Sequence, residues 1–199
     1  MEGRSKQLLT TLSPLHLYLI LLLGAKSREP IPGKLWLQKQ VFLLAQHIDK
    51  LQKEVGFEPY RMGPYSENVD AALSQLVMLG LVKQEPGKGL SLTRDGEDLY
   101  SLAANIARRE TLELIEEVKD QLNDLSSDEL LAYIYSTYPD MTKESEKLRE
   151  IQAKKLELAV KLYVEEKVSL QKAAQIAGLK LEAFINELRK RGVSVPLSP

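Results

Sequence analysis

Residues 66–92 read SENVDAALSQLVMLGLVKQEPGKGLSL, and this stretch decides the expected fold of the first half of the chain. Ser66 suits the N-cap of a helix because its hydroxyl can accept a hydrogen bond from a free N–H of the first turn. Apolar residues then recur every three or four positions, and Gly80 stands where a glycine usually ends a helix. The apolar face would consist of Val69, Ala72, Leu73, Leu76 and Val77.

A tight β-hairpin is expected directly after this helix. The β-capable runs LVKQE (residues 81–85) and LSLT (residues 90–93) flank the sequence PGKG, whose residues readily adopt turn conformations. Thr93 is expected to cap a further helix, which would direct Leu99, Leu102, Ala103 and Ile106 toward the core. A helix followed by a hairpin wing is the outline of a winged helix, a module that usually binds nucleic acid or another protein.

Two earlier helices complete this module. Residues 15–23 are apolar nearly all round, which predicts a buried helix. The apolar run of residues 15–25 is too short to span a bilayer, so we expect neither a signal peptide nor a membrane segment. Residues 35–55 show one continuous helical period, and the rigid, aromatic sequence of residues 57–66 predicts a structured loop.

The second half of the chain is expected to be helical throughout. Residues 111–122 have a helical period, and a capping box from Ser126 to Glu129 begins a helix that ends before Pro139. A long helix is predicted over residues 145–166, followed by a short helix capped by Ser169 and a final helix over residues 181–191. The final helix would bury Phe184, Ile185 and Leu188.

The spacing of the last two helices is typical of a helix-turn-helix. Ala174 is small where the two helices would approach, Gly178 lies at the turn, and Leu179 follows as an apolar anchor. The expected fold class is therefore mainly α with a small β-hairpin wing: a winged helix-turn-helix plus a C-terminal three-helix helix-turn-helix unit. We expect a winged-helix domain in residues 1–104, an acidic helical extension in residues 105–143, and a C-terminal domain in residues 144–199.

Charge is distributed unevenly along these segments, although the whole chain carries a formal net charge of only −1. Residues 1–104 hold twelve basic and eleven acidic side chains, residues 105–146 hold four and eleven, and residues 147–199 hold eleven and six. The basic tail suits phosphate contacts, and the acidic middle suits a solvated or protein-facing surface.

The C-terminal helix carries the first group of candidate DNA-binding residues. Asn186 could read an adenine edge, while Lys180, Arg189 and Lys190 would contact phosphates. Basic residues at this position also complement the dipole at the C-terminal end of a helix. Both interpretations remain open for the sequence alone.

The winged module carries the second group. Asn68, Ser74 and Gln75 would face outward from its recognition helix. Lys88 and Arg94 would decorate the wing and its base. Glu67 and Asp70 at the helix start would repel phosphate, so a protein-facing role competes with DNA contact there.

Catalysis has little support in this sequence. Without cysteine, the chain has no disulfide, no thiolate nucleophile and no cysteine-ligated metal. It contains no Gly-rich phosphate loop, nucleophile elbow or zinc motif, and its two histidines, His16 and His47, lie on different helices, where we expect them to pack. We expect no enzyme activity, no catalytic residue, no cofactor and no metal, in a cytoplasmic protein.

The sequence FEPYRMGPYSENVDAALSQLVMLGLV resembles the winged-helix proteins of the Panacea antitoxin-like group, with its matching residues at Tyr60, Gly63, Pro64, Ser66, Leu79, Gly80 and Leu81. The segment LTRDGEDL resembles the sequence after the wing in MarR- and PadR-type repressors, with Thr93 and Gly96 at matching positions. These resemblances cover about half of the chain and imply a winged-helix fold more strongly than they imply a function.

The tail, residues 158–193, is similar to a family of short, largely uncharacterised prokaryotic proteins regarded as antitoxin-like. The matching residues are Leu162, Tyr163, Ser169, Ala173, Ala174, Ala177, Gly178, Phe184, Leu188, Arg191 and Gly192. This resemblance implies a helix-turn-helix protein that controls transcription or neutralises a partner.

Together these observations predict a DNA-binding transcriptional regulator that acts by occupying an operator in double-stranded DNA. A homodimer is expected, because helix-turn-helix proteins commonly match two-fold DNA half-sites. The alternative is an antitoxin-like protein-interaction module whose acidic middle covers a basic toxin or nuclease.

Overall fold

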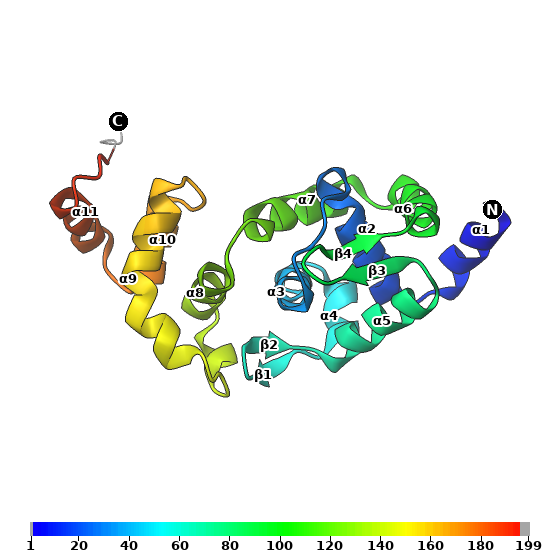
Figure 1. The fold of residues 1–199 in the computed structure, drawn as a ribbon, viewed down its shortest axis with the longest axis horizontal. Coiled ribbons are helices and arrows are strands. Elements are labelled where there is room, and N and C mark those ends of the chain that lie inside the picture. The colour runs from blue at the N-terminus through cyan, green and yellow to red at the C-terminus, as the bar shows by residue number, and fades with distance from the viewer. Residues whose placement is uncertain (1, 196–199) are drawn as a thin grey trace. The chain divides into compact units, whose positions relative to one another are not determined.

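The computed structural model describes residues 2–195, which form a mainly helical protein with two small two-stranded sheets (Figure 1). The chain divides into two compact units, called here the N-terminal unit (residues 2–58 and 64–124) and the C-terminal unit (residues 59–63 and 125–195). The division at Asp124 and Leu125 falls inside the stretch 105–143 that the sequence suggests as a separate extension.

The N-terminal unit is a helical domain with one β-hairpin. Its elements are α1 (Glu2–Thr11), α2 (Pro14–Arg28), α3 (Lys34–Ala45), α4 (Asp49–Val55), α5 (Glu67–Met78), β3 (Val82–Glu85), β4 (Gly89–Leu92), α6 (Arg94–Ile106) and α7 (Arg109–Asn123). The short strands β1 (Glu58–Tyr60) and β2 (Gly63–Tyr65), in which residues 59, 60 and 63 belong to the C-terminal unit, form the other sheet, where the sequence predicts a structured loop.

Helix α2 lies at the centre of the N-terminal unit, as predicted for residues 15–23. Leu19, Ile20, Leu22 and Leu23 are at most 1% exposed. α2 packs against α4, α5, α6, α7 and β4. Within residues 2–195, no helix combines the length and the apolar character that crossing a bilayer requires.

The sequence predicts a single helix over residues 35–55, and this prediction is wrong. The structure has α3 and α4 there, separated by a turn at which Ile48 adopts extended backbone angles (φ −121°, ψ 97°). The turn allows α4 to pack against α2 and α3 together, which a straight continuation of α3 could not do. Tertiary packing has therefore overridden a continuous helical period.

Helix α5 and the hairpin after it agree with the sequence pattern. The Ser66 hydroxyl accepts a hydrogen bond from the Val69 N–H, and Gly80 ends the helix with a left-handed φ of +71°. Strands β3 and β4 pair antiparallel, with Val82 opposite Leu92. Outside the hairpin, Ile31 pairs with β4 through two backbone hydrogen bonds to Leu90, of 2.8 and 2.9 Å.

Thr93 caps α6 as predicted, and Leu99 and Ala103 are buried. Ile106, predicted to face the core, is instead 69% exposed because it is the last residue of α6 and the chain turns away there toward α7. Val77 near the end of α5 is also 38% exposed. In both helices the apolar stripe extends beyond the buried part.

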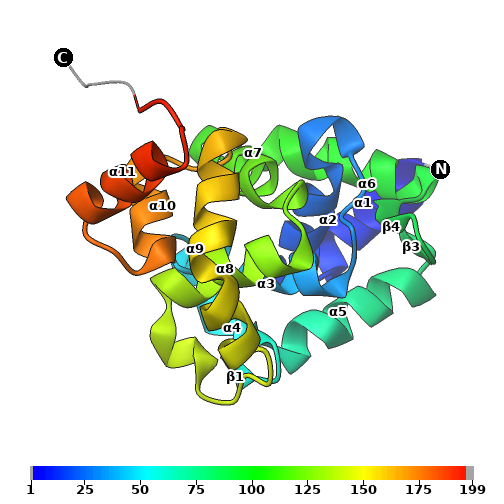
Figure 2. The same ribbon diagram turned by 60° about the vertical axis from the view of Figure 1, so that its left-hand side comes forward.

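From residue 125 on, the C-terminal unit is helical. Its elements are α8 (Ser127–Thr137), the short 3-10 helix η1 (Pro139–Thr142), α9 (Leu148–Val164), α10 (Leu170–Ala177) and α11 (Leu181–Lys190). The predicted capping box between Ser126 and Glu129 is present at the start of α8. α10 packs against α8, α9 and α11, which Figures 1 and 2 show from two sides. The long helix α9 is shorter at both ends than predicted.

Candidate nucleic-acid interface

Local sequence fixes the turn between α10 and α11. The Ser169 hydroxyl caps α10 by accepting a hydrogen bond from the Lys172 N–H at 3.1 Å. Gly178 ends α10 with a left-handed φ of +68°, and the Leu179 N–H donates to the carbonyl oxygen of Ala174 at 3.0 Å. This hydrogen bond satisfies a carbonyl at the helix end and sets the direction in which α11 leaves.

Buried apolar side chains fix which face of α11 points outward. Phe184 and Leu188 of α11 are fully buried, and the ring of Phe184 packs edge-on against Tyr163 with centroids 6.4 Å apart. Leu179, predicted as an apolar anchor, is 39% exposed, and Ile185 is only partly buried. Phe184 and Leu188 therefore anchor α11, since Leu179 lies in the turn before the helix begins.

The opposite face of α11 brings the predicted site residues together. Asn186 is exposed and lies one turn after Glu182 and Ala183 and one turn before Arg189 and Lys190. The α11 outer face is defined here as the exposed side chains Glu182, Ala183, Asn186, Arg189 and Lys190 together with exposed Lys180 at the N-cap. A helix with one amide side chain between basic positions is suited to reading a base edge while its cations contact phosphates.

The basic side chains near α11 differ in their partners. Lys190 pairs with Glu187 at 3.4 Å, and Arg191 pairs with Glu157 at 3.1 Å and with Glu187 at 3.4 Å. Lys180 and Arg189 form no ion pair with any of residues 4–195. Lys180 and Arg189 therefore remain available to an external anion.

The beginning of α11 adds a second feature that favours anions. Lys180 occupies the N-cap position, and its side chain makes no capping hydrogen bond. The first N–H groups of a helix have no partner within the helix, and the helix dipole makes this end positive. A phosphate near Lys180 would meet both the ammonium and these N–H groups.

Polar residues of α10 instead serve internal packing. Lys172 is half-buried, its Nζ donates to Thr137 Oγ1 at 2.6 Å and lies 4.1 Å from the ring centroid of Tyr133, and burial lowers its pKa. The Gln175 side chain donates to the carbonyl oxygen of Ser136 at 3.1 Å. These contacts fix α10 against α8, while Gln171 and Gln175 of α10 are exposed, as is the α11 outer face.

The candidate residues on α5 lie in the N-terminal unit, where each already has a hydrogen-bond partner. The Asn68 side chain donates to the backbone carbonyl oxygen of Glu54 at 2.8 Å. The Ser74 hydroxyl donates to the backbone carbonyl oxygen of Asp70, in its own helix, at 2.9 Å. Gln75 Oε1 lies 2.7 Å from His16 Nε2. These bonds hold one group of each side chain in place, the Nδ2 of Asn68, the hydroxyl of Ser74 and the Oε1 of Gln75.

The charged candidates of the N-terminal unit are also mostly paired. Lys88 lies 3.7 Å from Glu85, while Asp70, expected to repel phosphate, pairs with Lys34 at 2.7 Å. Arg94 is exposed and has no ion-pair partner among the residues the structure describes. The hairpin and its base thus offer one available cation, compared with two on the α11 outer face.

The structure also brings together residues that the sequence analysis did not select. Tyr18, His47, Lys50 and Arg108 line one cavity of the N-terminal unit. His47, which the sequence analysis predicts to pack, is exposed instead. The sequence carries no clear signal for this site, because its residues come from separate segments and Arg108 precedes α7, where helical periodicity gives a side chain no direction.

Comparison with protein families gave one match. Residues 133–198 match the model described as an uncharacterised protein family (UPF0175), a region that covers about a third of the chain and contains α9, α10 and α11. The similarity agrees with the resemblance of the tail to a short uncharacterised family and attaches no activity to it. Comparisons with curated proteins and with solved structures gave no match.

Proposed function

We propose that the protein is a DNA-binding regulator that occupies an operator through its C-terminal helix-turn-helix. The observation that carries this proposal is the α11 outer face, where exposed Asn186 lies between Lys180 and Arg189, two cations without an ion pair in the described chain. Residues 147–199 also hold eleven basic and six acidic side chains, so a polyanion is the partner that their charge favours.

The proposed contact follows from the dimensions of α11. A helix rises about 1.5 Å per residue, so Lys180 and Arg189 are separated by about 13 Å along the axis. The major groove admits one helix and is about 12 Å wide, so cations near both ends of α11 can reach phosphates while Asn186 faces the bases. Asparagine pairs through its amide with adenine N6 and N7.

We further propose that α5, β3 and β4 form a winged helix. The helix, the hairpin after it and the pairing of Ile31 with Leu90 support this assignment. Asn68, Ser74 and Gln75 each make one hydrogen bond within the unit, and the acidic Glu67 is exposed at the start of α5, so this module suits dimerisation or partner contact better than base reading. A homodimer would present two copies of α11 to two half-sites of an operator.

The test measures binding of the full chain to the duplex upstream of its own gene. Fluorescence anisotropy reports this binding at each of a series of salt concentrations. Two phosphate contacts from each copy of α11 in a homodimer should give a slope of log K against log salt of about −3 to −4, at about 0.9 per contact. Absence of duplex binding at low salt would reject the proposal.

A second candidate function is an antitoxin-like one, in which the protein covers a basic partner. The observation that favours it is the exposed face of α7, which carries Glu110, Glu113, Glu116, Glu117 and Asp120. Parts of this face are neutralised, since Glu113 pairs with Arg109 and Asp120 with Lys26. Affinity purification from the native cell tests it, and recovery of a stoichiometric basic protein together with no duplex binding would favour this function over the first.

A further inference from the structure

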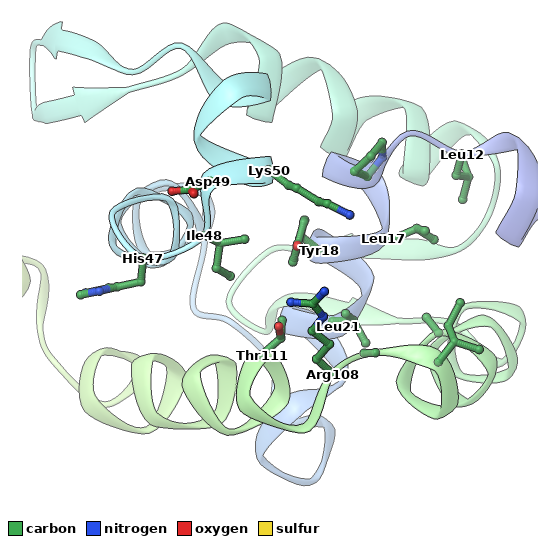
Figure 3. Close-up of a pocket in the computed structure, with 14 residues that line it drawn as sticks. Leu12, Leu17, Tyr18, Leu21, His47, Ile48, Asp49, Lys50, Arg108 and Thr111 are labelled. Atoms are coloured by element: carbon green, nitrogen blue, oxygen red, sulfur yellow. The ribbon is translucent and has the colours of Figure 1, made fainter.

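A cavity of about 690 Å³ opens in the N-terminal unit, away from the groups used in the proposed function. It is formed by α2, the segment from His47 to Lys50 at the start of α4, and the end of α6 with the start of α7 (Figure 3). Small-molecule sites in proteins commonly have volumes of about 300–1,000 Å³. The size is therefore that of a binding site rather than of a packing defect.

One part of the cavity wall is apolar, beside a polar part. Leu17 and Leu21 of α2 and Ile48 before α4 contribute branched side chains, and Ile106 at the end of α6 is 69% exposed. An apolar molecule bound in the cavity would cover Ile106 together with these side chains. Burial of such a molecule would be driven by the hydrophobic effect.

Two cations lie at the polar part of the same cavity. Figure 3 shows Lys50 and Arg108 on the two sides of Tyr18, with Asp49 and His47 set apart from them. Burial raises the pKa of Tyr18, and the positive charge of Arg108 opposes this rise, which agrees with a guanidinium near the phenol. Neither Lys50 nor Arg108 forms an ion pair with another of residues 4–195.

The first turn of α7 strengthens the preference for an anion. Arg108 is the N-cap residue of this fifteen-residue helix, and its side chain makes no capping hydrogen bond. A guanidinium has no acceptor atom, so it cannot satisfy the N–H groups that open a helix. The Thr111 side chain lines the cavity one turn further on and adds a hydroxyl donor.

From this geometry we infer that the cavity binds a small amphipathic carboxylate, whose apolar body lies against Leu17, Leu21 and Ile106 and whose carboxylate meets Arg108 and Lys50. The Tyr18 hydroxyl between the two cations would donate a hydrogen bond to the same carboxylate. The apolar body can be an alkyl chain or an aromatic ring, and the experiment distinguishes these two sources. No step of this inference depends on DNA binding.

The test uses isothermal titration of the full chain with octanoate and with 1-naphthoate, each compared with its neutral alcohol, 1-octanol or 1-naphthalenemethanol. At least one carboxylate should bind saturably, and about tenfold more tightly than its alcohol. Which of the two carboxylates binds identifies the apolar body. Amide NMR shifts should be confined to residues 12–21, 47–50 and 103–111, which places the ligand in the cavity.

Matched variants separate recognition of the carboxylate from general attraction to a basic surface. Arg108→Gln should weaken carboxylate binding about tenfold and leave the binding of the alcohol unchanged. Arg109→Gln is the control, because Arg109 is adjacent and exposed but pairs with Glu113 and does not line the cavity. Its carboxylate affinity should equal that of the wild type.

Three results would overturn the inference. They are absence of saturable binding by both carboxylates at low millimolar concentration, equal affinity for carboxylate and alcohol, and an equal loss in the Arg108→Gln and Arg109→Gln variants. A result of any of these kinds leaves the proposed DNA contact by α11 unaffected, because that contact uses other residues.

Discussion

The Nζ of Lys39 lies 2.7 Å from the carbonyl oxygen of Pro64, and the lysine is only 2% exposed. This hydrogen bond joins α3 to the residues that lead into α5. Burial without a carboxylate partner lowers the pKa of Lys39 to about 7. The interior of the N-terminal unit therefore contains a lysine that loses its charge near neutral pH.

The stability of the N-terminal unit should rise with pH between about 7 and 9. In the folded state the pKa of Lys39 is about 7, and that of buried Lys119 is lowered to about 8, whereas both are near 10.5 in the unfolded chain. The unfolded state therefore binds more protons in this window, so the free energy of unfolding increases with pH. This free energy of unfolding is measured at each pH by denaturant titration, with the fluorescence of Trp36, the chain's one tryptophan, as the signal.

Lys39→Met should reduce that pH dependence, because one of the two titrating groups is removed. Lys53→Met is the control, since Lys53 is exposed on α4. The control should keep the slope of the wild type. A slope that is the same in all three proteins would show that Lys39 keeps its charge in the folded state.

Gly24 and Tyr100 form a close contact between α2 and α6. A Cβ added to residue 24 would lie 2.1 Å from the Cδ2 of the Tyr100 ring. Gly24→Ala should therefore lower the free energy of unfolding by about 1–3 kcal/mol, as overpacking usually does. In a Tyr100→Leu background the same substitution should cost much less, and additive losses in this double-mutant cycle would contradict the contact.

Glu129 is the buried ionic centre of the C-terminal unit. It is 1% exposed and lies 2.8 Å from Lys161 and 3.7 Å from Lys167. Burial acts to raise the pKa of Glu129. The hydrogen bond from Lys161, the cap hydrogen bonds with Ser126 and the positive charge of Lys167 together hold this pKa below its ordinary value.

Glu129→Gln should reduce the hydrogen-exchange protection of α8 and α9 by about 1–3 kcal/mol, because two lysines lose a buried charged partner while the cap can persist. Glu165→Gln is a matched control: Glu165 contacts the same two lysines but is 37% exposed. Its effect should stay below about 0.5 kcal/mol. Equal losses in the two variants would contradict the central role of Glu129.

Gly178 connects stability to the proposed function. Its φ of +68° disfavours any residue with a Cβ, although asparagine tolerates this region better than alanine. Gly178→Ala should destabilise α10 and α11 by about 1 kcal/mol and weaken duplex binding, while Gly178→Asn should lose less of both. Native-state hydrogen exchange and anisotropy measure the two effects, and equal behaviour of the variants would contradict the need for a left-handed turn.

Local signals predicted the elements that depend on local contacts. The caps at Ser66, Thr93, Ser126 and Ser169 are all present, because a capping hydrogen bond joins residues only three positions apart. The hairpin of β3 and β4 was predicted for the same reason. The helix α1 was not predicted, and it packs against α6, an element far away in sequence.

Long-range packing explains the remaining differences. In α3 the polar residues Gln38, Lys39 and Gln40 are buried beside the apolar ones, so helical periodicity could not identify its partners. Gln38 is bonded to the backbone of Ser66, and Gln40 to Asn123 of α7. The α11 outer face could be predicted because a short amphipathic helix has one clear apolar stripe, whereas the cavity could not, since its residues come from separate segments.

The most direct test compares two double variants in anisotropy titrations with the upstream duplex. Lys180→Ala with Arg189→Ala removes two positive charges from the α11 outer face, and Lys88→Ala with Arg94→Ala removes two from the hairpin and its base. The first should weaken binding at least tenfold and lower the salt slope by about 2 for each copy bound, while the second should leave affinity within about twofold. The reverse order of losses would contradict DNA contact through α11.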